Sequence, residues 1–160
     1  MTDPELLPPS VDPSKKLIGI REVRARNDAT PRTVSKVRDF EVVTDEVKGA
    51  NTGPTPLETV LAAFLGCEGV IINRCAEVMK FAYSGVDLEC AGEVDARGSR
   101  GVQGVRPHFQ AVRLKVTLYT DEPAERIAKL RKNVEYRCPV MNLLRDADVA
   151  LDVTWETRPA

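Results

Sequence analysis

Residues 53–70 read GPTPLETVLAAFLGCEGV and contain the clearest helix start in the chain. Thr55, Pro56 and Glu58 fit a capping box, with threonine at the N-cap, proline at the first helical position and glutamate at the third. The residues that follow are apolar nearly all round, which predicts a helix that is buried on most faces and runs to about Phe81. One sheet cannot cover such a helix in a chain of 160 residues, so we expect a homodimer.

Outward from this helix, the sequence shows strand and helix patterns in turn. Strands are expected at 16–26, 33–44, 86–96, 109–119 and 149–157, and shorter helices at 124–135 and 140–144. A turn at Asn27-Asp28 joins the first two strands into a hairpin. Hairpins separated from helices indicate the α+β class. Residues 1–15 contain four prolines and are expected to form a flexible tail, followed by a single domain over residues 16–160.

Composition and charge exclude several classes of function. The chain has 23 basic and 24 acidic residues, a net charge of −1, and few aromatic side chains, which argues against nucleic-acid binding. The N-terminus lacks the basic start and apolar core of a signal peptide. The apolar run 60–72 is too short to span a membrane and is broken by Glu68. We therefore expect a cytoplasmic protein that binds neither nucleic acid nor a membrane.

The chain has four cysteines, Cys67, Cys75, Cys90 and Cys138. None of them is in a C-x-x-C pair, and His108 is the single histidine, so the sequence predicts no metal site and no cofactor. Cytosolic thiols are kept reduced, which favours free or reactive cysteines over structural disulfides. Cys75 and Cys90 are most simply packing residues.

The other two cysteines leave two interpretations open. Cys67 lies deep in an apolar helix pattern and is either a small core residue or, with a cation beside it, a reactive thiol. Cys138 precedes Pro139, which predicts that it caps the next helix with its sulfur at the positive end, where the pKa of a thiol is lowered. It is otherwise a small residue at a corner between two helices.

Several segments resemble the OsmC/Ohr family. They are GPTPLETVLAAFLGC around Cys67, YRCPVMNLL around Cys138 and RDFEVVTDE before the long helix; DARGSRGVQGVRPHFQAVRLKV also resembles one OsmC-like branch. The resemblance covers about residues 17–155. It implies an OsmC-like fold, an intertwined homodimer in which curved antiparallel sheets pack around long central helices.

The resemblance also implies an activity, the thiol-dependent reduction of organic, lipid-type hydroperoxides in the response to oxidative stress. Cys67 would attack the peroxide as a thiolate and become a sulfenic acid, and Cys138 would resolve it to a disulfide. A dithiol reductant such as a lipoylated protein would then reduce the disulfide. The family places an arginine over the first cysteine; we expect Arg38 in this role, with Arg32 as the alternative.

One position departs from the pattern of the hydroperoxide-resistance branch. That branch has a glutamate directly after the helix-starting proline, where it holds the arginine, and here the position is Leu57. Glu58 is nine residues before Cys67, so on one helix the two face opposite sides. Asp45 or Glu46 is then a candidate to orient the arginine. The alternative hypothesis is a non-catalytic dimeric OsmC-like protein that binds a small apolar ligand.

Overall fold

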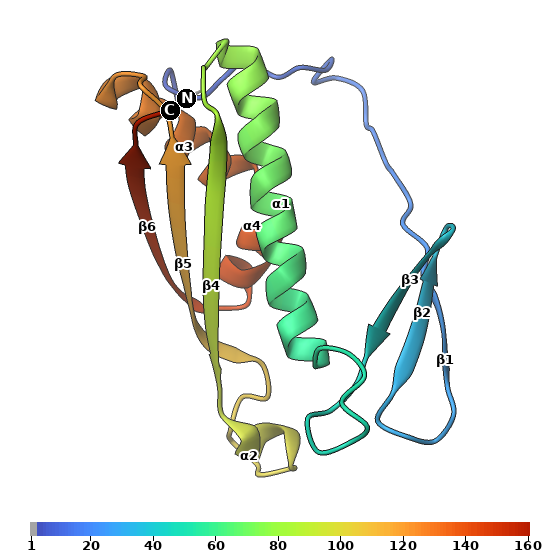
Figure 1. Ribbon diagram of the computed structural model, residues 1–160. Helices are drawn as coiled ribbons and strands as arrows, with labels where there is room; N and C mark the ends of the chain where they lie inside the picture. Colours follow the sequence, from blue (N-terminus) through green and yellow to red (C-terminus); the bar gives the residue numbers. More distant parts are fainter. Residues whose placement is uncertain (1–2) are drawn as a thin grey trace. The chain divides into compact units, whose positions relative to one another are not determined.

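A computed structural model of the protein describes residues 3–160 (Figure 1). The chain divides into two compact units, one of residues 9–60 and the other of residues 3–8 with 61–160. The elements in chain order are β1 (Arg24–Asn27), β2 (Thr33–Val37), β3 (Phe40–Thr44), α1 (Pro56–Met79), β4 (Gly85–Val94), α2 (Ala96–Ser99), β5 (Phe109–Tyr119), α3 (Ala124–Arg137), α4 (Pro139–Asp146) and β6 (Ala150–Arg158).

The unit of residues 9–60 contains a three-stranded antiparallel sheet in the order β1-β2-β3. The hairpin of β1 and β2 is confirmed, but its first strand begins at Arg24 rather than at residue 16. The strand expected over residues 33–44 is two strands, because Val37 pairs with Phe40 across a tight turn at Arg38 and Asp39. No Asn-Gly or Asp-Gly pair announces this turn, which is why the sequence did not reveal it.

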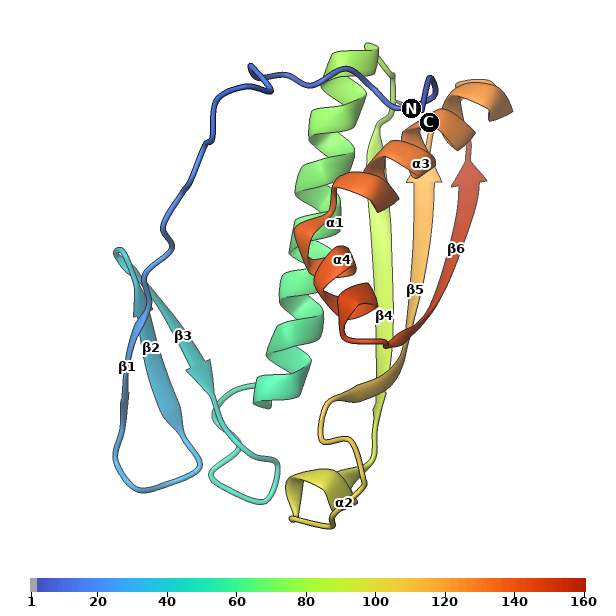
Figure 2. The same cartoon turned by 180° about the vertical axis from the view of Figure 1, so that it is seen from behind.

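The larger unit is built on the sheet β4-β5-β6, with α1, α3 and α4 on one of its faces (Figures 1 and 2). β4 is antiparallel to β5, whereas β6 is parallel to β5. The parallel pairing follows from the connection, since α3 and α4 together carry the chain back across the sheet before β6 begins. The α+β class is confirmed. The resemblance implied antiparallel sheets, and the parallel pair of β5 and β6 departs from that expectation.

Alternation along β4 and β5 separates the two faces of this sheet. Val112, Leu114, Val116 and Leu118 of β5 are buried, and the core continues into the helices through Ile72, Leu130, Val134 and Met141. The opposite face carries charge pairs such as Arg113 with Glu93. A sheet with one apolar and one charged face is satisfied by helices on one side only.

The start of α1 has the predicted capping box. The backbone N–H of Thr55 donates to Oε2 of Glu58 at 2.7 Å, and the N–H of Glu58 donates to Oγ1 of Thr55 at 3.3 Å. The helix ends at Met79, two residues earlier than predicted, because Lys80 adopts a left-handed conformation with a φ of 50°. The N–H of Phe81 then bonds back to a carbonyl of the last turn, as in other left-handed helix ends.

In the single chain, α1 buries one face rather than most of its surface. Its buried residues are Phe64, Glu68, Ile71, Ile72, Cys75 and Ala76. Leu57, Val60, Val70 and Val78 remain 43–50% exposed. By length and hydropathy alone α1 would suffice to cross a membrane, but the core helix of a globular domain meets the same criterion. The residues that it contributes to the core identify it as such a helix.

Residues 3–8 pack along α3. The buried side chain of Asn133 accepts from the N–H of Leu7 at 2.7 Å and donates to the carbonyl of Glu5 at 3.1 Å. Arg137 donates to the carbonyl of Leu7 at 2.6 Å, and Lys132 pairs with the carboxylate of Asp3 at 2.8 Å. The expected boundary between tail and domain after residue 15 stays a prediction, and residues 1–2 of that tail lie outside the described residues.

Candidate functional site: two thiols and a buried carboxyl

The structure brings Cys67 and Cys138 together. Cys67 lies in α1 and is half-buried, whereas Cys138 lies between α3 and α4 and is fully buried. Although 71 positions separate them in the chain, their Sγ atoms are 3.4 Å apart, with Cys138 as the donor. Two sulfurs at this separation are in van der Waals contact, so only a small movement separates the pair from a disulfide bond.

Local sequence fixes the position of Cys138. Its N–H bonds to the carbonyl of Val134 at 2.9 Å and closes α3, while Pro139 begins α4 directly afterwards. A residue before proline disfavours the helical conformation, and Cys138 is extended here with a ψ of 112°. Its Sγ accepts from the N–H of Met141 at 3.5 Å. The prediction that Cys138 caps this helix is confirmed.

The cap acts on the pKa of the thiol in the predicted direction, but the prediction that it makes Cys138 a low-pKa thiol is wrong. Burial, first of all, raises the pKa of the Cys138 thiol well above its usual range, and the neighbouring Glu68 carboxyl and the hydrogen bond to Cys67 raise it further. The N–H of Met141 acts in the opposite direction and is outweighed. Desolvation of the charged form therefore outweighs one backbone donor, and Cys138 is a thiol rather than a thiolate at neutral pH.

Glu68 is a candidate site residue that the sequence did not single out. Its side chain is fully buried on α1, directly after Cys67. Among residues 3–160, neither of its carboxyl oxygens has a hydrogen-bond partner. The sequence contained a signal, because Glu68 is four residues after Phe64 and four before Ile72, both fully buried, and so lies on the core face of the helix.

The surroundings of Glu68 change its protonation. Burial raises the pKa of its carboxyl to about 7, and Glu135 raises it as well, while Cys138 and Arg145 lower it. The thiol of Cys138 is close enough to act on this carboxyl, and its sulfur also contacts the sulfur of Cys67 at 3.4 Å. Cys138 is a neighbour of the carboxyl without a hydrogen bond of good geometry to it. At pH 7 the carboxyl is partly protonated and ready to exchange a proton.

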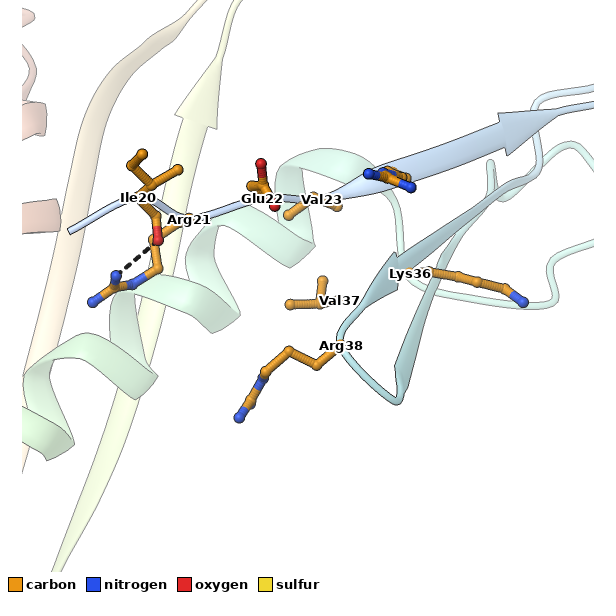
Figure 3. A pocket seen from close by; sticks show the side chains of 8 residues that line it. Ile20, Arg21, Glu22, Val23, Lys36, Val37 and Arg38 are labelled. Carbon is orange, nitrogen blue, oxygen red and sulfur yellow. Dashed lines mark hydrogen bonds between the residues drawn. The ribbon is translucent and has the colours of Figure 1, made fainter.

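Arg38 belongs to the other compact unit and lies in the turn between β2 and β3. It adopts a φ of 55°, and its guanidinium is 5.1 Å from the ring centre of Phe40. Figure 3 shows its side chain extending from the turn. It lines a cavity of about 1120 Å³ with Arg21, Arg24, Lys36 and four further residues. Among residues 3–160 it has no carboxylate partner. Its expected place over Cys67 stays a prediction.

The alternative arginine, Arg32, takes part in a network in its own unit. Its Nε donates to the hydroxyl of Thr52 at 3.2 Å, and both the N–H and the hydroxyl of Thr52 donate to Asp45 at 3.0 Å. The hydrogen bond from the N–H of Thr52 is the main cause that lowers the pKa of the buried Asp45, and Arg32 makes a smaller contribution. Of the two carboxylates considered, Asp45 therefore organises its loop and reaches Arg32 through Thr52, whereas Glu46 is exposed.

Comparison with known proteins identifies the family. The family model described as OsmC-like protein matches residues 49–154, which include both cysteines of the pair. The chain belongs to the OsmC-like family. Comparison with curated protein sequences finds no match.

Solved structures of the family share this fold. An OsmC-like protein from Mycoplasma pneumoniae is 16% identical, with a TM-score of 0.78 over 88% of this chain and 99% of the other. An organic hydroperoxide resistance protein OsmC from Legionella pneumophila is 18% identical, with a TM-score of 0.63 over 89% and 98%. The organic hydroperoxide resistance protein OhrB of Bacillus subtilis is 18% identical, with a TM-score of 0.59 over 88% and 98%. At such identities the likeness shows the fold alone.

Proposed function

We propose that this OsmC-like protein is a thiol-dependent peroxidase that reduces organic hydroperoxides. The observation that carries the proposal is the 3.4 Å contact between the Sγ atoms of Cys67 and Cys138. An attacking thiol and its resolving thiol must come into contact to form a disulfide, and this contact supports that pairing. The family includes proteins named for organic hydroperoxide resistance, which supports the same substrate class.

The two cysteines differ in the way that the reaction needs. Cys67 is half-buried, which supports the access of a peroxide to it, whereas Cys138 is shielded from solvent. The Cys67 thiolate attacks the terminal peroxide oxygen, the O–O bond breaks, and the departing alkoxide takes up the proton that the Cys67 thiol released on ionising and leaves as an alcohol. The resulting sulfenic acid reacts with Cys138 to give a disulfide and water. A dithiol reductant, such as a lipoylated protein, restores both thiols.

Arg38 is proposed to stabilise the attacking thiolate. The support for this role is the resemblance of the segment RDFEVVTDE, which contains Arg38, to a family that places an arginine over the first cysteine. Arg38→Gly removes the guanidinium and suits the turn. We expect it to slow peroxide consumption at least tenfold, while Arg32→Ala retains the rate. The reverse result would transfer the role to Arg32.

The first test is a single turnover. Reduced protein receives one equivalent of cumene hydroperoxide, free thiols are blocked, and disulfides are mapped by mass spectrometry. We expect a bond between Cys67 and Cys138, no peroxide consumption by Cys67→Ser, and a sulfenic acid that persists and over-oxidises in Cys138→Ser. Consumption of peroxide by Cys67→Ser would overturn the proposal.

We also propose a cytoplasmic homodimer. The apolar residues that α1 exposes in the single chain, Leu57, Val60, Val70 and Val78, support a second copy as their cover. The four cysteines are all free within the described residues 3–160, which suits a reducing compartment. Leu57 stands where the hydroperoxide-resistance branch has a glutamate, and this difference favours a second candidate function. The second candidate is a non-catalytic dimeric protein that binds a small apolar ligand. That candidate predicts four free thiols after peroxide treatment and a melting temperature raised by an apolar ligand.

A further inference from the structure

The two-thiol reaction does not use Glu68, although its carboxyl is buried beside the two cysteines. A fully buried carboxyl without hydrogen-bond partners among residues 3–160 is costly, and most buried polar groups are satisfied. Glutamine or an apolar residue would fill the same core position without a charge. The group it does adjoin is the thiol of Cys138, the reacting atom of the second step.

We propose that Glu68 is the general base of the resolving step, taking the proton from Cys138 as its sulfur attacks the oxidised Cys67. This inference rests on the proposed peroxidase function and adds a catalytic residue to its second half. The geometry places the three groups together, because Cys67 and Glu68 are neighbours on α1 and Cys138 lies against both.

The resolving thiol needs such a base. Its pKa is well above the usual range, so the fraction of Cys138 that is a thiolate at neutral pH is very small. A base works best when its own pKa lies near the working pH, and burial raises the pKa of Glu68 to about 7. The same burial that makes Cys138 unreactive therefore makes Glu68 a suitable proton acceptor.

The step balances within the site. The Cys138 S–H bond breaks and its proton passes to the Glu68 carboxylate. The Cys138 sulfur, now carrying the electron pair, attacks the Cys67 sulfur, the S–S bond forms and the S–O bond of the sulfenic acid breaks. The departing hydroxide takes the proton from Glu68 and leaves as water. Cys138 is oxidised, the sulfenic sulfur is reduced, and Glu68 returns to the carboxylate.

A purely electrostatic role is the competing explanation. The charged groups that act on Glu68 are Glu135 from α3 and Arg145 from α4. Glu135 is paired with Arg131 at 2.7 Å and with Arg145 at 3.6 Å. Glu135→Gln removes a negative charge near the site but leaves the base, so it is a matched control for Glu68→Gln.

The experiment separates the two steps of one turnover. After one equivalent of cumene hydroperoxide, peroxide consumption reports the attack by Cys67, and timed thiol blocking reports the disulfide. In Glu68→Gln we expect peroxide consumption within threefold of the wild type and disulfide formation about 100-fold slower. Glu68→Asp, which keeps a carboxyl, recovers part of that loss. Glu135→Gln forms the disulfide at the wild-type rate.

The pH profile adds a readout that a structural role would not move. In the wild type the rate of disulfide formation rises with pH and levels off above about 7, as the carboxyl ionises. In Glu68→Gln the rate continues to rise above pH 8 with ionisation of the thiol. Equal rates and profiles in the two proteins, or an equal loss in Glu135→Gln, would overturn the proposal.

A second assay tests the role of Glu68 without peroxide, so its result does not depend on the proposed peroxidase function. A thionitrobenzoate group is placed on Cys67 in a Cys90→Ser background, since Cys90 is the other half-buried thiol. Attack by Cys138 releases the group as a coloured anion without any peroxide. Glu68→Gln should slow this release about 100-fold. If the wild type consumes no peroxide but releases the group faster than Glu68→Gln, the peroxidase proposal fails and Glu68 remains the base. Equal rates of release in the two proteins would refute Glu68 as the base.

Discussion

At the scale of single residues, the site is governed by desolvation. Cys138 and Glu68 are both removed from water, and burial raises the pKa of each. The charged forms are the ones that lose hydration, so both groups favour their protonated state. The N–H of Met141 at the sulfur is too weak to reverse this for Cys138. Cys67 is half-buried and lies at the edge of the same buried region.

Glu68 is expected to make stability depend on pH in an unusual direction. Its pKa is about 7 in the folded protein against 4.5 in the reference state, so between these values the folded state holds the proton that the unfolded state has lost. The free energy of unfolding therefore falls as pH rises from 4.5 to 7, by about 3 kcal/mol, and then levels off. Below pH 4.5 this loss is absent.

The measurement is the difference between the wild type and Glu68→Gln, because other carboxyl groups titrate in both. Urea unfolding at pH 4, 6 and 8 should show the variant gaining stability relative to the wild type with rising pH. A difference that does not change with pH would show that Glu68 is ionised in the folded protein or is not buried.

The residue scale also shows where sequence reasoning succeeds and where it fails. Pro139 predicted the cap at Cys138, because a proline restricts the residue before it whatever the tertiary structure. The raised pKa of Cys138 depends on what covers it, and a local pattern does not contain that information. Glu68 interrupts the apolar run 60–72 in the sequence, although its spacing from Phe64 places it on the buried face of the helix.

At the scale of elements, local chemistry sets the helix ends and the turns. The capping box at Thr55 starts α1 as predicted, since it needs only residues within one turn. The turn between β2 and β3 was missed because it uses Arg38 in a conformation that glycine or asparagine normally supplies. The parallel pairing of β6 was missed because the order of strands in a sheet does not follow from alternation.

Removing the cap should weaken α1 without touching the thiols. Thr55→Ala deletes the hydroxyl that accepts from the N–H of Glu58, and we expect a loss of about 1 kcal/mol in the free energy of unfolding. Thr55→Ser, which keeps the hydroxyl, is the control. Chemical denaturation measures both, and equal stability of the two variants would show that the capping box contributes nothing.

At the scale of the whole molecule, the helix α1 links the core to the proposed dimer. Its inner face carries Cys67 and Glu68 to the site, while Val70 and Val78 remain half-exposed in the single chain. A helix with apolar residues on both sides was predicted from the sequence to require a second subunit. The apolar composition of the helix indicates that another surface must bury its exposed side chains, but it does not identify that surface.

The proposed dimer is tested at Val70. We expect the wild type to elute at twice its mass of 17.6 kDa, and Val70→Lys to weaken association at least 100-fold, because an unpaired charge buried in an interface costs about 3 kcal/mol or more. Val102, 47% exposed in a loop, provides the control Val102→Lys. Sedimentation at several concentrations measures both; a wild-type monomer would refute the dimer.

The contact between Cys67 and Cys138 encloses β4, β5 and α3 in the stretch of chain between them. Once oxidised, that stretch becomes a closed ring of about 70 residues, and the unfolded chain loses about 4 kcal/mol of conformational freedom. In a domain of this size such a change raises the melting temperature by roughly 10 °C. Each catalytic cycle would then alternate between a reduced form of lower melting temperature and an oxidised form of higher melting temperature. A thermal unfolding curve would show which of the two forms a cell contains.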